Sequence, residues 1–151
     1  MSSPPPPGRP AQPGAGPSSY VGERLGLPPE GRGSVAGWGR RIVALFIDWI
    51  ASLLVASFFA GEAVMQSHGW ESWLPLLVFW LEASVLTALV GSSFGQLVLR
   101  IAVVRLDRKP VNLLVALLRT LLICLVVPPV IYNRDRRGLH DLAAGTVTVR
   151  R

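Results

Sequence analysis

Three charged side chains lie deep inside long apolar stretches of this 151-residue chain: Asp48, Glu82 and Arg119. An ionisable group in hydrocarbon is costly, so it usually faces a partner or a water-filled cavity. At about 1.5 Å of rise per helical residue, Asp48 and Arg119 each lie ~10 Å from the nearest segment end and Glu82 ~13 Å. We therefore expect all three near one level of a helical bundle. Arg119 would bridge the two carboxylates with its planar fork of donors.

This charged level has two interpretations that do not exclude each other. In the first, an ion cluster fixes how the helices pack. In the second, the same groups form a cation or proton site, since the carboxylates outnumber the arginine and leave a net charge of −1. A carboxylate in a low-dielectric environment also holds its proton more tightly, which suits proton exchange.

The elements that must position these residues are three apolar segments, at 42–64, 73–91 and 113–132. Half of the chain is hydrophobic and only 16% is charged, against roughly 25% charged residues in a soluble domain. Each segment has enough residues to cross the ~30 Å hydrocarbon core of a bilayer. The sequence predicts an all-α membrane protein, a small helical bundle of three hydrophobic segments in contact with the lipid bilayer.

Basic residues predict the orientation of these segments. Arginines precede the first segment and follow the second, whereas the loop at 65–72 has no Lys or Arg. The positive-inside rule then places the N-terminus and the 92–112 loop in the cytoplasm. The C-terminal tail is also basic, so either 113–132 is re-entrant and bends back at Pro128-Pro129, or the rule fails at the last segment.

Two stretches outside the apolar segments have a β-like pattern. Residues 97–106 are rich in β-branched side chains and 146–150 alternate strictly, so the two could pair as a small sheet on one side of the membrane. The alternative for 94–104 is a short interfacial amphipathic helix.

Small residues recur every fourth position along the first segment, which favours close approach of another helix. They are Ala44, Asp48, Ser52, Ala56 and Ala60. The stripe predicts that Asp48 faces the bundle rather than lipid. Internal packing and self-association both explain it.

The first 37 residues differ from the rest of the chain, because proline and glycine dominate them and large apolar side chains are few. Such a segment cannot offset the entropy of ordering, so 1–37 is predicted to be a disordered cytoplasmic tail. The stretch also lacks the apolar core of a signal peptide. The membrane domain is expected over 38–151.

Other chemistries find little support. Cys124 is a lone thiol in an apolar run, and His68 and His140 are far apart without cysteine partners, so no metal site is expected. The chain has no Walker-type loop and no GxGxxG, and neither an enzyme nor a cofactor is expected. Basic residues beside membrane segments suit anionic lipid headgroups better than nucleic acid.

Together these motifs resemble the RDD family of bacterial membrane proteins. The first span of that family opens with an arginine and carries an aspartate about two turns later, as Arg41 and Asp48 do in GWGRRIVALFIDWI. GQLVLRIAVVRLD and LLVALLRTLL, with Arg119, are similar to the later motifs. Asp141 in RRGLHDLAAGTVTV would be the second aspartate. The resemblance covers about residues 37–151.

The resemblance implies a multi-pass protein of the bacterial plasma membrane and a transport role, because some members look like sodium- or potassium-proton antiporters. This chain departs from the pattern in the short distance between Arg119 and RRGLHD, which leaves room for one membrane segment. We therefore expect a small cation/proton transporter or ion-pathway subunit that works as a homo-oligomer or with a partner membrane protein. The alternative is a non-transporting adaptor or assembly subunit.

Overall fold

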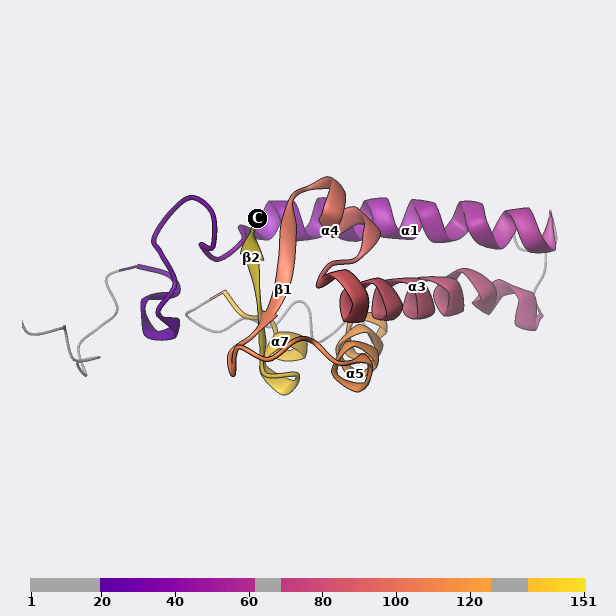
Figure 1. Ribbon diagram of the computed structural model, residues 1–151. Helices are drawn as coiled ribbons and strands as arrows, with labels where there is room; N and C mark the ends of the chain where they lie inside the picture. Colours follow the sequence, from indigo (N-terminus) through magenta and orange to yellow (C-terminus); the bar gives the residue numbers. More distant parts are fainter. Residues whose placement is uncertain (1–19, 62–68, 126–135) are drawn as a thin grey trace, which may run out of the picture.

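The computed structural model describes residues 20–61, 69–125 and 136–151. Two long helices lie against each other, and a two-stranded sheet stands across one end of them (Figure 1). In chain order the elements are η1 (Glu23–Leu25), α1 (Trp38–Ala60), η2 (Trp70–Trp73), α3 (Leu74–Val90), α4 (Phe94–Val98), β1 (Ile101–Arg105), α5 (Leu113–Cys124), α7 (Leu139–Ala143) and β2 (Thr146–Arg150).

The long helices have polar and small residues inside and large apolar residues outside. The buried residues of α1 are Ala44, Asp48, Ser52 and Ala56, so the predicted stripe packs inside the protein, with Ala60 half-buried at its end. Only 22% and 28% of the most apolar windows of Trp38–Ala60 and Trp70–Val90 are buried. A soluble protein would bury these faces, whereas a bilayer is an apolar solvent that stabilises them in the exposed position.

The β pairing expected from the sequence is confirmed. β1 and β2 are antiparallel, with Ile101 opposite Arg150 and Arg105 opposite Thr146. The strand is shorter than the stretch 97–106, because α4 extends to Val98. The alternative prediction, a helix over 94–104, is therefore correct only for residues 94–98.

Residues 33–36 lie along the free edge of β2. Backbone hydrogen bonds join Gly33 to Arg150, Ser34 to Arg150 and Ala36 to Thr148, at 2.8–2.9 Å. Val35 packs with Val147 and Val149 in a small apolar core. The prediction of a disordered tail up to residue 37 is thus wrong for residues 20–37, because β2 offers this segment backbone partners and an apolar surface. Residues 1–19 lie outside the described residues.

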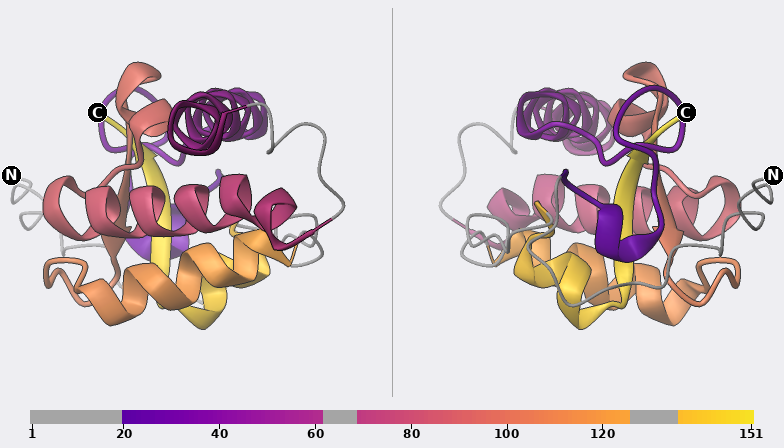
Figure 2. Two further views of the ribbon diagram at one scale, coloured as in Figure 1. Left: turned by 90° about the vertical axis from the view of Figure 1, so that its right-hand side faces the viewer. Right: turned by 90° about the vertical axis from the view of Figure 1, so that its left-hand side faces the viewer.

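The third apolar segment, 113–132, is described up to Leu125. Its described helix is α5, whose 12 residues correspond to roughly 18 Å, short of a ~30 Å membrane core. α5 lies below α3 and is seen nearly end-on in Figure 1, whereas Figure 2 shows α5 side-on and α1 end-on, so the axis of α5 runs across that of α1. Residues 126–135, with the predicted bend at Pro128-Pro129, lie outside the described residues.

The C-terminal segment returns to the end of the molecule at which α1 begins. β2 pairs with β1 there, and α7 packs against both α5 and β2. This is the arrangement that the re-entrant alternative predicts, whereas a full crossing would carry the C-terminus to the far end of α1. The described part of the chain therefore has two candidate spans and one short crossing helix.

Candidate functional site

Arg41, in the first turns of α1, joins three parts of the chain. Its guanidinium donates from Nη1 to Asp141 Oδ2 at 3.1 Å, from Nη2 to the Thr148 carbonyl at 3.1 Å and from Nε to the Ala36 carbonyl at 3.2 Å. These bonds connect the start of α1 to α7 and β2. A planar guanidinium suits this task because its donors point in fixed directions.

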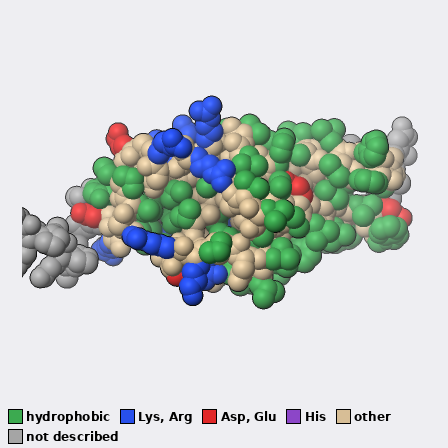
Figure 3. Space-filling model, viewed as in Figure 1, with side chains coloured by type: hydrophobic (Ala, Val, Ile, Leu, Met, Phe, Trp, Pro, Cys, Tyr) green, Lys and Arg blue, Asp and Glu red, His purple; other side chains and the backbone are tan. Residues whose placement is uncertain are grey.

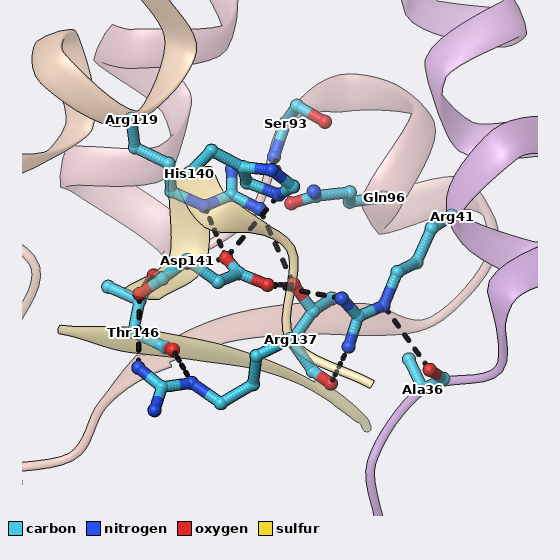
Figure 4. Close-up of polar contacts among 10 residues, drawn as sticks. Ala36, Arg41, Ser93, Gln96, Arg119, Arg137, His140, Asp141 and Thr146 are labelled. Atoms are coloured by element: carbon cyan, nitrogen blue, oxygen red, sulfur yellow. Dashed lines mark hydrogen bonds and ion pairs between the residues drawn. The ribbon is translucent and has the colours of Figure 1, made fainter. Parts of the chain in front are cut away.

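Asp141 is the centre of this arrangement and is fully buried. Oδ1 accepts from Arg119 Nε at 3.0 Å and from Thr146 Oγ1 at 3.1 Å. Oδ2 accepts from Arg41 and, at 3.4 Å, from Thr148 Oγ1. Figure 4 shows Arg119 and Arg41 approaching the carboxylate from opposite sides. A buried charge requires such compensation, because its desolvation otherwise costs several kcal/mol.

The loop that carries Asp141 is held by Arg137, which is itself buried. Arg137 donates from Nε to the Thr146 carbonyl at 2.9 Å and from Nη2 to the Asp141 carbonyl at 3.1 Å. Gly138 precedes the first residue of α7, so Asp141 lies in the first turn of this short helix. There its negative charge is favoured by the free amide groups of the helix start.

The acid limit of stability should depend on Asp141. Burial alone would raise the pKa of this carboxyl, but the neighbouring positive groups, Arg119 foremost, outweigh burial and lower the pKa to about 2. A carboxyl in the unfolded chain has a pKa near 3.9. Because the folded value is the lower one, the ionised group stabilises the fold by about 2–3 kcal/mol above pH 4, and this contribution disappears as the pH falls to about 2.

Thermal unfolding of the wild type and of Asp141→Asn in detergent across pH 2–6 measures this contribution. The difference in melting temperature between the two proteins is expected to be constant above about pH 5 and to become smaller below pH 4. A difference in melting temperature that does not depend on pH would contradict the lowered pKa of Asp141 in the folded protein.

Asp48 lies two turns further along α1 and is also buried. Its Oδ2 accepts a 2.6 Å hydrogen bond from the Ser93 hydroxyl, and its Oδ1 accepts a 2.5 Å bond from the Gly95 backbone amide. Both donors are electrically neutral. They belong to the start of α4, which packs directly on α1.

Glu82 approaches the same turn from α3. Its Oε1 accepts from the Phe94 amide at 3.3 Å, while Oε2 is buried without a hydrogen-bond partner among the described residues. The two carboxylates predicted to lie at one level are therefore connected by residues 93–95. The prediction that Arg119 bridges them is wrong, because Arg119 donates to Asp141 instead. Counting residues from the segment ends predicts how deep each residue lies along its own helix. It does not predict how the axis of α5 is oriented relative to the other helices.

A cavity of about 80 Å³ lies between α1, α3, α5 and α7. Its charged and titratable lining residues are Arg41, Asp48, Arg119 and His140, and its neutral polar ones are Thr87, Ser93, Gln96, Thr120 and Thr148. Apolar side chains, among them Ile42, Phe79 and Ile123, complete its wall. A cavity of this size has room for a few water molecules beside the polar groups. The cavity thus brings Asp48 together with Arg41 and Arg119, the two arginines that bind Asp141.

Sequence reasoning missed several partners of the candidate residues. Thr146 and Thr148 bind Asp141, and the alternation in TVTV, which puts both threonines on one face of a strand, could have revealed them. Ser93 and Gly95 bind Asp48 from the start of α4, a helix of five residues that is too short to show a periodic pattern. His140 Nε2 lies 3.6 Å from Asp141 Oδ1 and was considered only as a metal ligand.

Two long helices with exposed apolar faces and a buried cluster of charges are typical of integral membrane proteins. The chain belongs to the RDD family, whose sequence model matches residues 35–145. This match confirms the resemblance seen in the sequence, and its range includes Arg41, Asp48 and Asp141. Comparisons with curated proteins and with solved structures found no match.

Proposed function

We propose that this membrane protein binds a small cation or a proton at Asp48, as a small cation/proton transporter or as a subunit of an ion pathway. The observation that carries the proposal is the carboxylate of Asp48, which lines the cavity between α1, α3, α5 and α7 and accepts hydrogen bonds from neutral donors, Ser93 and Gly95. Asp141 accepts from both arginines of the site, which argues for a structural role. The two interpretations of the intramembrane charges thus apply to different aspartates.

Glu82 supports the same proposal. One of its carboxylate oxygens is buried and unpaired among the described residues, while the other binds the turn that also holds Asp48. A carboxylate with an open acceptor beside a second one suits transient capture of a cation or proton. We infer that Asp48 holds the ion and that Glu82 exchanges it.

The proposed orientation follows from the charges at the sheet end. Figure 3 shows Lys and Arg side chains gathered at that end, whereas hydrophobic side chains cover the helices. By the positive-inside rule this end faces the cytoplasm of a plasma membrane. Its exposed basic residues include Arg32, Arg40, Arg100, Arg108, Lys109 and Arg151.

Purified protein reconstituted into proteoliposomes with an imposed pH gradient tests the proposal. Addition of Na⁺ or K⁺ is expected to dissipate the gradient. Asp48→Asn should reduce the rate at least tenfold, because the neutral side chain no longer attracts a cation. Glu82→Gln should also slow dissipation. Asp107→Asn, which removes an exposed carboxylate paired with Arg105, is the matched control and should leave the rate unchanged.

Absence of flux in the wild type, or equal flux in Asp48→Asn, would contradict the proposal and favour the adaptor alternative. The small cavity and the short α5 favour assembly with further chains, as a homo-oligomer or with a partner membrane protein, for a complete pathway. Crosslinking in native membranes separates these cases, because an adaptor should be captured with a reproducible heterologous partner.

A further inference from the structure

A groove of about 670 Å³ opens at the sheet end of the protein. It lies between the last turn of α3, the faces of β1 and β2, and the loop that follows β1. Thr87 is the one described residue that it shares with the cavity beside Asp48. The groove is therefore a second hollow with its own surroundings.

Four cationic residues line this groove, and no carboxylate is among its described lining residues. Arg108 and Lys109 are exposed in the loop after β1. Arg105 forms an ion pair with Asp107, with 2.6 Å between Nη2 and Oδ2. The uncompensated positive charge of the groove therefore lies mainly on the other three cationic residues. The side chain of Arg151 donates to the carbonyl of Val90, at the end of α3. The rim of the groove thus attracts anions.

Apolar side chains with accessible surface also line the groove. They include the half-buried Leu25 and Leu27 and the exposed Val104 and Leu106. A free anion such as inorganic phosphate gains nothing from such a lining, whereas an amphiphile does. The groove also reaches Leu89 and Val90, which end the second candidate span, so it lies where the hydrocarbon gives way to headgroups.

We propose that this groove binds one anionic phospholipid from the leaflet on the sheet side, with the phosphate against Arg108 and Lys109 and the glycerol region against Val104 and Leu106. The cationic rim, the apolar lining and the position at the end of α3 support this occupant together. The proposal does not depend on transport, because it involves none of the proposed ion-binding side chains.

Native mass spectrometry of the purified full chain in a neutral detergent tests the inference. Titration with dioleoylphosphatidylglycerol is expected to show one bound lipid, at least tenfold tighter than dioleoylphosphatidylcholine. The double variant Arg108→Asn with Lys109→Gln should weaken that binding about 10- to 30-fold. Asn is chosen at 108 because Arg108 has φ 57°, a conformation that Asn adopts readily. Both side chains are exposed, so the variant should fold.

The matched control is Arg32→Gln with Arg40→Gln, which removes the same charge from exposed positions outside the groove. It should change the affinity less than threefold. Equal weakening by both double variants would overturn the inference, since the lipid would then respond only to net charge. Equal affinity for the two lipids, or full displacement by millimolar inorganic phosphate, would also overturn it.

Discussion

Asp141→Asn is expected to destabilise the protein by about 3–5 kcal/mol, because it leaves the Arg41 and Arg119 guanidinium groups buried without their counter-charge. Asn preserves the shape of the side chain and one acceptor oxygen, so the effect reports on charge rather than on packing. For a domain of this size the melting temperature in detergent should fall by about 10 °C or more. The measurement is thermal unfolding at neutral pH, followed by circular dichroism.

Asp107→Asn is the control for this experiment, since it removes the carboxylate of the exposed ion pair with Arg105. Exposed pairs contribute about 0–1 kcal/mol, so the melting temperature should hardly change. A further test is the double variant Arg119→Met with Asp141→Leu, which should cost less than the sum of the single variants because only Arg41, and no longer Arg119, is left without its counter-charge. A loss below about 1 kcal/mol in Asp141→Asn would contradict the assigned role.

Gly95→Ala is expected to cost about 2–4 kcal/mol, although it adds one methyl group. A Cβ at Gly95 would collide with the backbone carbonyl of Ala44 and lie 2.9 Å from its carbonyl carbon. Because backbone cannot move aside as a side chain does, α4 must shift away from α1. The Gly95 amide would then withdraw from Asp48, so stability and cation flux should both fall.

Two variants sharpen this prediction. Gly39→Ala lies in α1 with no heavy atom within 4 Å of its new Cβ, and it should leave the protein unchanged or stabilise it by up to about 1 kcal/mol. Ala44→Gly should fail to rescue Gly95→Ala, because the obstacle is a backbone oxygen. A Gly95→Ala protein as stable as the wild type would show that α4 is not fixed against α1.

The parts of the fold that follow from local patterns could be predicted from the sequence. A spacing of four put Ala44, Asp48 and Ser52 on the buried face of α1, and strict alternation marked β2. The ordered motifs indicated the family. These features depend on periodicities of the helix and the strand, which a sequence displays directly.

The pairing of the charges could not be predicted in the same way. Arg119 and Asp48 were both inferred to be ~10 Å deep, yet α5 runs across the bundle and brings Arg119 to Asp141. The site also depends on Ser93 and Gly95, from a turn whose position is set by tertiary packing. Order in residues 20–37 depends on the free edge of β2, which the composition of that segment does not reveal.

The pairing of residues 33–36 with β2 has a consequence for biosynthesis. It joins the start of the domain to its last strand, and Arg41 to a carboxylate 100 positions later. Both candidate spans leave the ribosome before that carboxylate is made. Arg41 therefore cannot form its ion pair with Asp141 until the later residues have been synthesised. The polar cluster therefore forms only after Asp141, Thr146 and Thr148 have been synthesised. A chain interrupted before Thr146 has both candidate spans but lacks two partners of the buried Asp141 carboxylate.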